Sequence, residues 1–231
     1  MPDLVLRDVV VTAPGDDDVV ILRPTTLTLT EHRVALVGAN GSGKSTLARL
    51  LNGLVEPSAG TVTVDGLDTV RDGAAVRRRV GFVFTDPGAQ LVMPTAAEDV
   101  ALSLRRTVRD AAERRLRAVE VLDGYGLGHL ADVSVQSLSG GQKQMLALAG
   151  VLAAGPDVVV ADEPTTLLDR RNTRSIGDAL LSMRQQLVLV THDLDLAARC
   201  DRVLVVADGQ VVHDGDPAEA VARYCAEVDA S

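Results

Sequence analysis

The stretch VALVGANGSGKSTLARLL, residues 34–51, decides how the chain folds. It opens with a short apolar run, passes through a glycine-rich segment at 38–45, and then places apolar residues at helical spacing. A strand, a loop and a helix are therefore predicted in that order, with the strand at 34–38 and the helix at 45–54. The segment between them fits the pattern G-x-x-x-x-G-K-[ST] in the structural context that this pattern requires.

The glycine-rich loop is predicted to wrap a phosphate group. Its glycines let the backbone turn so that successive N–H groups point inward, and the amino terminus of the following helix adds its dipole. Lys44 is predicted to reach the outer phosphates and the Ser45 hydroxyl to ligate Mg²⁺. The alternative, a glycine-rich turn without a ligand, fits the complete pattern much less well. The predicted nucleotide-binding residues are Gly38, Ala39, Asn40, Gly41, Ser42, Gly43, Lys44, Ser45 and Thr46.

Strands and helices alternate on either side of this unit. Residues 1–30 predict two antiparallel strands joined by the turn APGDDD at 13–18, which we expect to form an edge sheet. Helical spacing from Pro94 to about Val133 predicts an inserted group of helices. Further strands are predicted at 61–70, within 77–84, and at 157–162, 187–191 and 202–213, and further helices at 140–154, 172–185 and 194–199.

This alternation indicates an α/β fold with a mostly parallel core sheet that is covered by helices on both faces. The fold prediction adds an antiparallel β edge and an inserted helical subdomain. We expect a single domain over residues 1–231, in which 1–93 and 155–231 form the core and about 94–154 the helical subdomain.

Composition narrows the classes of partner. The formal net charge of −9 argues against nucleic acid, because proteins that bind its phosphate backbone concentrate positive charge. No apolar run approaches the roughly 18 residues of a membrane span, and the amino terminus lacks the pattern of a secretory signal. Cys200 and Cys225 lie outside any CxxC or Cys/His cluster, which favours plain thiols. We therefore expect a cytoplasmic protein that could act at a membrane only through a partner.

Two adjacent acids follow a buried strand. The segment VVVAD at 158–162 ends at Asp162, and ligands of open α/β sheets bind at the carboxyl ends of such strands. Asp162 can hold Mg²⁺ through water, and Glu163 can polarise the water that attacks a γ-phosphate. An acid that merely caps a strand end is the alternative, and the presence of the phosphate loop makes it the weaker one.

The run Leu138-Ser139-Gly140-Gly141-Gln142 leads into the predicted helix at 140–154. S-x-x-Q before an apolar run is also an ordinary capping box. That alternative does not explain the two glycines, which are unfavourable in a helix and useful where a backbone must approach another group closely. The run therefore predicts a second helix terminus that faces phosphate.

These motifs together resemble those of the ABC transporter ATPase family. The phosphate loop, LSGGQ, the Asp162-Glu163 step and His192 after a strand occur in that order, and the likeness covers nearly the whole chain. The resemblance implies that two cassettes, identical or paralogous, pack head to tail. Residues 139–141 of one cassette would then reach the γ-phosphate held by Lys44 of the other. It further implies that Glu163 is the catalytic base, that His192 contacts the γ-phosphate, and that Asp169 in TTLLD communicates across the dimer.

The chain departs from the family pattern at two places. The family places an aromatic ring near residue 13 to stack on adenine, whereas TAP at 12–14 has none. Stacking on a base is worth about 1–3 kcal/mol, so weak discrimination between ATP and GTP is expected. The family's Q-loop glutamine aligns with Thr85, and Gln90 lies a few residues further on. Either of these two residues could couple the nucleotide to transport.

Other segments are similar to the ATPases of energy-coupling-factor importers, which take up vitamins and transition-metal ions. They are the runs at 50–69, 80–90 and 94–101, and those at 67–84 and 138–152 look most like the biotin module. The resemblance implies a transmembrane coupling subunit, a small substrate-binding membrane subunit and a peripheral place on the cytoplasmic face of the membrane. The alternatives are a cobalt, nickel or other vitamin importer, a soluble ABC ATPase that acts on DNA or ribosomes, and a P-loop kinase or GTPase.

Overall fold

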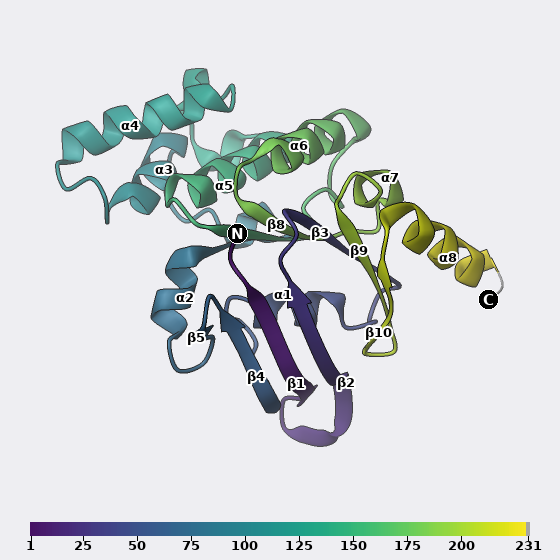
Figure 1. The fold of residues 1–231 in the computed structure, drawn as a ribbon. Coiled ribbons are helices and arrows are strands. Elements are labelled where there is room, and N and C mark those ends of the chain that lie inside the picture. Colours follow the sequence, from purple (N-terminus) through teal and green to yellow (C-terminus); the bar gives the residue numbers. More distant parts are fainter. Residues whose placement is uncertain (230–231) are drawn as a thin grey trace.

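The computed structural model describes residues 1–229, and the side chains of residues 1–226. Two sheets and the helices packed on them make up this part of the chain (Figure 1). One sheet has six strands in the order β10-β9-β3-β8-β7-β6, and the other has four in the order β2-β1-β4-β5. The predicted alternation of strands and helices is confirmed.

The six-stranded sheet brings several functional segments to one edge. All its strands are parallel except β10, which pairs antiparallel with β9. The strands β3, β8 and β7 are neighbours, and their carboxyl ends carry the loop at 38–45, the segment after Val190, and Asp162; ligands of open α/β sheets bind at such ends. The strands are β3 (Arg33–Val37), β6 (Val80–Val83), β7 (Val158–Asp162), β8 (Gln186–Val190), β9 (Arg202–Ala207) and β10 (Gln210–Gly215).

The predicted hairpin of residues 1–30 belongs to the second, antiparallel sheet. β1 (Leu4–Ala13) pairs with β2 (Asp16–Leu29) in a register that sets Leu4 opposite Leu29. On its other side β1 pairs with β4 (Ala59–Val64), which turns through Asp65-Gly66 into β5 (Leu67–Asp68). These strands form a sheet of their own, and the alternate buried residues of β1 and β2 pack with α1 in one apolar cluster.

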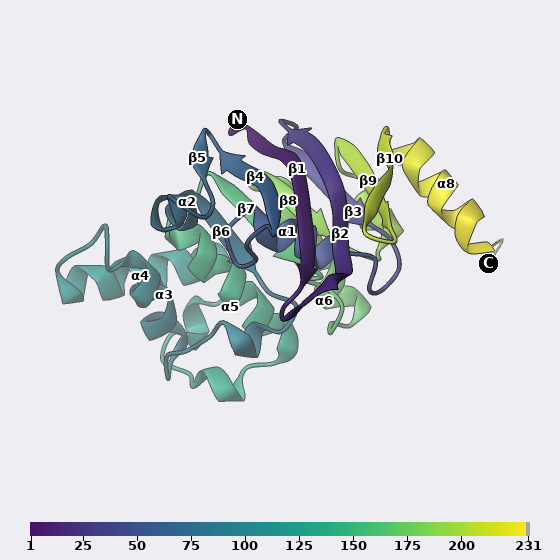
Figure 2. The ribbon, with the colours of Figure 1, turned by 90° about the horizontal axis from the view of Figure 1, so that it is seen from below.

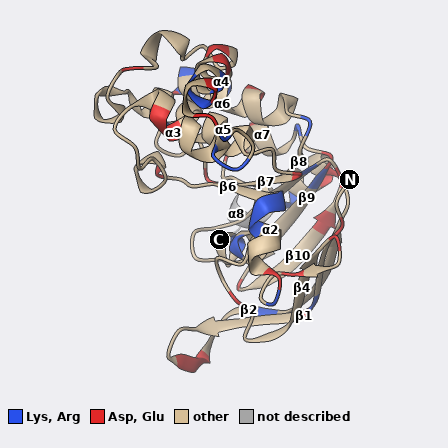
Figure 3. Cartoon of the chain, turned by 90° about the vertical axis from the view of Figure 1, so that its left-hand side faces the viewer, with Lys and Arg blue, Asp and Glu red and all other residues tan. Residues whose placement is uncertain are grey.

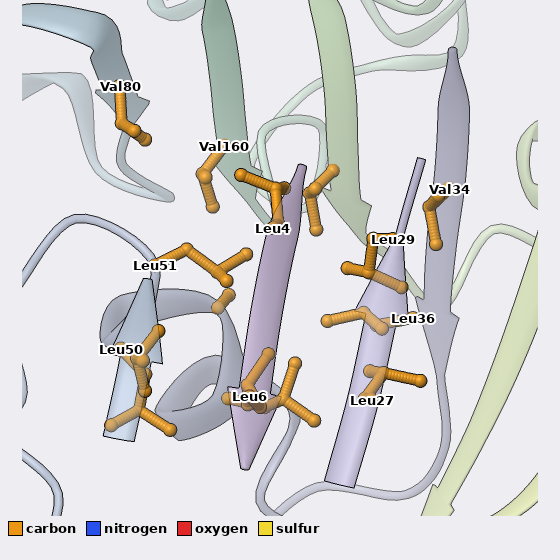
Figure 4. Packing of buried hydrophobic residues seen from close by; sticks show 14 of the residues in the cluster. Leu4, Leu6, Leu27, Leu29, Val34, Leu36, Leu50, Leu51, Val80 and Val160 are labelled. Carbon is orange, nitrogen blue, oxygen red and sulfur yellow. The ribbon is translucent and has the colours of Figure 1, made fainter. Parts of the chain in front are cut away.

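Helix α1 (Lys44–Leu50) lies between the two sheets, and its leucines join both in one core. Figure 4 shows Leu4 and Leu6 of β1 in this cluster together with Leu50 of α1 and the following Leu51. The predicted helix at 45–54 is too long. Gly53 adopts φ of 70°, and the N–H groups of residues 54 and 55 return to the carbonyl of Arg49, which ends the helix.

The opposite face of the parallel sheet is covered by α5 (Gly140–Ala153), α6 (Arg170–Ser182), α7 (Leu194–Ala197) and α8 (Pro217–Asp229). Helices on one face and α1 with the antiparallel sheet on the other agree with the predicted coverage. The predicted helix at 172–185 is displaced: α6 begins at Arg170, because the Asp169 side chain caps it by accepting from Asn172 N–H, and it ends at Ser182.

A third apolar cluster lies under α3 (Ala96–Leu104) and α4 (Ala111–Gly124), which pack on α5 through Leu146. Figure 2 shows these helices together at one side of the sheets. The structure places helices where the subdomain at 94–154 is expected, and the division into subdomains stays a prediction. The remaining elements are α2 (Gly73–Arg79) and the 3₁₀ turns Pro87–Ala89, Gly128–Leu130 and Val135–Ser137. Within the described residues, no helix has the length and hydropathy needed to cross a membrane.

Candidate active site

The glycine-rich loop after β3 forms a cradle. At Gly38 a Cβ atom would lie 2.1 Å from the Val206 carbonyl oxygen, so only glycine fits there. Lys44 is buried, and its Nζ donates to the carbonyls of Gly38 and Ala39 at 2.7 Å each. The buried Ser42 hydroxyl has no hydrogen-bond partner among the described residues. A polar atom of this kind calls for a ligand, and a phosphate oxygen fits it.

Charge in the cradle also suits a phosphate. Burial lowers the pKa of Lys44, while the nearby carboxylates of Glu163 and Asp162 act in the opposite direction by favouring the ammonium form. The pocket is lined by Ile21, Asn40, Gly41, Ser42, Gly43, Lys44, Ser45, Thr46 and Glu163. Among the predicted nucleotide-binding residues, all from Asn40 to Thr46 line it, together with the predicted base.

Asp162 ends β7 and is 1% exposed. Ser45 Oγ donates to its Oδ1 at 2.7 Å, and Arg49 Nη2 donates to its Oδ2 at 3.0 Å. The structure thus brings together the two predicted Mg²⁺ residues. The sequence reasoning missed Arg49, although it lies four residues after Ser45 and therefore on the same face of α1.

Glu163 occupies a strained position. Its φ is 52°, in the left-handed region that glutamate rarely adopts, and its N–H donates to the Val190 carbonyl of β8 at 3.0 Å. Its Oε2 accepts from His192 Nδ1 at 2.7 Å and from Thr166 Oγ1 at 2.9 Å. The backbone turn thus aims the carboxylate at the rim of the cradle, and two side chains hold it there. Thr166 is a second residue that the sequence reasoning missed.

The LSGGQ run stands apart from this cradle. Ser139 caps α5 in a reciprocal capping box: its Oγ accepts from Gln142 N–H at 3.3 Å, and Gln142 Oε1 accepts from Ser139 N–H at 2.8 Å. None of residues 138–142 is among those that line the phosphate pocket of their own chain. Inside one chain the run therefore forms a capping box outside the phosphate pocket, and its contact with phosphate stays a prediction.

Thr85 and Gln90 face different surroundings. Thr85 Oγ1 donates to the backbone carbonyl of Asp162 at 2.7 Å, which ties it to the acidic step. Gln90 Oε1 accepts from Phe84 N–H at 3.3 Å, and Gln90 lines a groove between α2, β6, α3 and α5. The two candidates for the Q-loop role thus lie in different places, Thr85 beside the acidic step and Gln90 in the groove, and which of them has that role stays a prediction.

A second hollow adjoins the phosphate pocket and shares Ile21 and Thr46 with it. It includes Thr12 and Ala13, where the resemblance implies an aromatic ring, and no ring lines it. The rings of Phe82 and Phe84 lie in and just after β6 and contact each other at 4.7 Å between centroids. The expected absence of a stacking ring therefore holds for this hollow.

The same arrangement of loop, strands and helices occurs in known proteins. Residues 22–166 match the ABC transporter family. This chain belongs to the ABC transporter ATP-binding family. It is 42% identical over 205 residues to a biotin transport ATP-binding protein of Rhizobium etli, covering 89% of this chain and 91% of the relative. It is 44% identical over 194 residues to an energy-coupling factor transporter ATP-binding protein of Lactiplantibacillus plantarum, covering 80% and 68%.

Among solved structures of this family, the chain is similar to an ATP-binding cassette described as a dimer in a post-hydrolysis state bound to ADP and Pi. The TM-score is 0.81 at 31% identity, and the likeness covers 93% of this chain and 98% of that one. The predicted ABC cassette fold and the resemblance to this family are confirmed. The chain binds ATP and is an ATPase of the ABC type.

This cassette is expected to hydrolyse GTP nearly as well as ATP. Without a ring beside Ala13, the base contributes little of the 1–3 kcal/mol that stacking supplies, so kcat/KM for the two nucleotides should agree within about 5-fold. Steady-state hydrolysis measures this ratio. As a matched gain of function, Ala13→Tyr should lower KM for both nucleotides by about 5-fold or more. A strong preference of the parent for ATP would contradict the prediction.

Proposed function

We propose that this cassette is the ATP-hydrolysing subunit of an energy-coupling-factor importer that takes up the vitamin biotin through membrane partners. The observation that carries the hydrolytic part is the Glu163 carboxylate held by His192 and Thr166 at the rim of the phosphate cradle. The transport part rests on the names of its relatives, an energy-coupling factor transporter protein and a biotin transport protein.

In the proposed reaction, the chain's residues hold the triphosphate and move one proton. Lys44 exchanges its two backbone carbonyls for phosphate oxygens, and the Ser42 hydroxyl gains the partner it lacks. The Ser45 hydroxyl would ligate Mg²⁺ and Asp162 would hold the ion through water, and the ion would neutralise phosphate charge there. Glu163 accepts a proton from the attacking water, and His192 steadies Glu163 and approaches the γ-phosphate.

The proposed site is completed by a second cassette. Ser139, Gly140 and Gly141 do not line the phosphate pocket of their own chain; Ser139 and Gly140, at the amino terminus of α5, are exposed, and Gly141 behind them is buried. A second copy, or a paralogue, placed head to tail would present this terminus to the γ-phosphate. Asp169 lies at the start of α6, next to that interface in the proposed dimer.

The transmembrane coupling subunit is proposed to bind the groove that contains Gln90. Val92 and Leu102 line this groove and are 67% and 37% exposed, which provides apolar surface for a partner. Arg77 and Arg78 of α2 also line it, and Figure 3 shows the positive charge of this helix. Gln90 would sense the partner on the groove side, and Thr85 would pass the change to Asp162.

Co-purification tests the importer proposal. The tagged chain, expressed in the organism that naturally produces it, should be recovered from the membrane fraction together with a transmembrane subunit and a small membrane subunit. Uptake of labelled biotin should then depend on Lys44, with cobalt and nickel uptake measured in parallel. Uptake of a metal ion instead of biotin would keep the importer and replace the substrate. Recovery only from the soluble fraction, without a membrane partner, would favour a soluble ABC ATPase.

Arg49 is predicted to stabilise the nucleotide-free site. Arg49→Met removes one of the two side chains that bond the buried Asp162 carboxylate, so it should lower the free energy of unfolding by about 1–3 kcal/mol. Chemical denaturation measures the loss. Mg²⁺ with a non-hydrolysable ATP analogue should reduce it, because the ion restores positive charge beside Asp162. The exposed pair Arg115–Asp132 provides the control, since Arg115→Met should cost less than about 1 kcal/mol. Equal losses in the two variants would contradict the role of Arg49.

A further inference from the structure

Asn172, in the first turn of α6, contacts the Asp169 loop, which precedes α6, and the LSGGQ run. Both segments lie at the interface of the proposed two-cassette dimer. Its side-chain Nδ2 donates to Asp169 Oδ2 at 3.0 Å, and its backbone N–H donates to Asp169 Oδ1 at 2.9 Å. Both oxygens of the Asp169 carboxylate are therefore bonded by the same residue. The carboxamide of Asn172 thus adds a second hydrogen bond to the carboxylate that caps α6.

The other neighbour of Asn172 is Gly141. A Cβ atom at Gly141 would lie 2.4 Å from Cγ and Oδ1 of Asn172 and 2.8 Å from Nδ2. Real Cβ atoms do not approach other atoms this closely, so the carboxamide packs directly against the bare backbone of the second glycine. A methyl group there would require the flexible carboxamide to shift, and this shift would disturb its hydrogen bond to Asp169.

The two glycines of LSGGQ therefore differ in their surroundings. A Cβ at Gly140 would meet only Leu168 Cδ2, at an ordinary distance of 3.8 Å. Gly140 has no steric reason within its own chain to lack a side chain, whereas Gly141 has one, and that reason is Asn172. The pair of glycines thus has one member that faces outward and one that accommodates α6.

We propose that Asn172 is a positioning residue that ties the amino terminus of α5 to the Asp169 loop, so that both segments approach the partner cassette as one unit. This inference rests on the proposed two-cassette site. Asn172 is not among the residues that line the phosphate cradle, and the two hydrogen bonds that it donates within the described part of the chain go to Asp169, so we place its effect on dimer formation and not on nucleotide binding by one chain. Without the Asn172 side chain, the amino terminus of α5 and the Asp169 loop can move independently. Association of two cassettes must then also order these segments, and this entropic cost weakens the dimer.

The first experiment measures ATPase activity against protein concentration. For Asn172→Ala, the concentration that gives half-maximal specific activity should rise by about 3- to 10-fold, as expected for one lost hydrogen bond and its packing. The affinity of the monomer for a fluorescent nucleotide should stay unchanged. Asn172→Asp keeps the shape of the side chain but sets a carboxylate against Asp169, so it should show the same defect in a well-folded protein. Thr173→Ala, at the next position of α6, is the matched control and should behave as the parent.

A double-variant comparison tests the link to Gly141. Gly141→Ala alone should raise the half-maximal concentration at least as much as Asn172→Ala, because its methyl group shifts the carboxamide. Gly141→Ala combined with Asn172→Ala should be no worse than Gly141→Ala, because the methyl group enters the space that Asn172 leaves. Defects that multiply in the double variant would overturn the proposal.

Failure of this inference and failure of the two-cassette proposal have different signatures. If the specific activity of the parent does not depend on protein concentration, the two-cassette proposal fails before Asn172 is considered. The other outcome is that the parent shows specific activity that rises with protein concentration while both variants, Asn172→Ala and Asn172→Asp, follow the parental curve. In that case the positioning role of Asn172 is wrong and the two-cassette proposal stands.

Discussion

Glu163→Gln should bind ATP, accumulate as a closed dimer and lose turnover by about 10²- to 10⁴-fold, the range that a general base contributes. The amide keeps the size of the carboxylate, and its carbonyl oxygen can still accept from His192 Nδ1 and Thr166 Oγ1, so the resting geometry is retained. The amide cannot accept a proton from water. Steady-state hydrolysis and size-exclusion chromatography with ATP measure the two effects.

The control for this variant is Glu120→Gln, which removes a carboxylate of an exposed ion pair with Arg117 on α4. It should hydrolyse ATP at the parental rate. Hydrolysis by Glu163→Gln at the parental rate would remove Glu163 as the base. Lost turnover without an ATP-dependent dimer would instead show that Glu163 is needed before the chemical step, for nucleotide binding or association.

The order of the elements could be predicted from the sequence because each depends on local patterns. The apolar runs of β7 and β8 and the alternation in β1 set the strands, and the sequence Asp65-Gly66 sets a turn. Helix ends were less predictable, since they depend on single contacts. α1 stops early because the N–H groups beyond it return to Arg49, and α6 starts early because Asp169 caps it.

Some residues of the candidate site could likewise be predicted from local sequence patterns, and others could not. Lys44, Ser45 and the Asp162-Glu163 step could be predicted because a contiguous motif fixes the first two and a strand end fixes the others. Arg49, Thr166 and Asn172 were missed because their roles depend on contacts across the fold or on the direction of one carboxylate. Gly141 shows the limit most clearly: the sequence indicates a close approach, and only the structure shows that Asn172 is the group that approaches.

Two variants that are inactive alone should restore activity when they are mixed. Lys44→Ala removes the phosphate contact in one half of a shared site. Ser139→Asp damages the other half, because aspartate still caps α5 but sets a negative charge toward the γ-phosphate. In an equal mixture about half of the dimers contain one chain of each kind. Each of these mixed dimers has one intact site out of two, so about a quarter of all sites in the mixture are intact. The mixture should therefore show about a quarter of the parental ATPase activity.

A chain that carries both Lys44→Ala and Ser139→Asp provides the complementary experiment. When the double variant is mixed equally with the parent, every mixed dimer has two damaged sites, so only parental dimers work and about a quarter of the activity remains. If each chain completed its own site, the first mixture would give none and the second about half. Thr95→Asp controls for the change of helix cap, because Thr95 caps α3 through the same kind of capping box, and it should hydrolyse ATP as the parent does. Values near zero and one half would contradict a site shared between two cassettes.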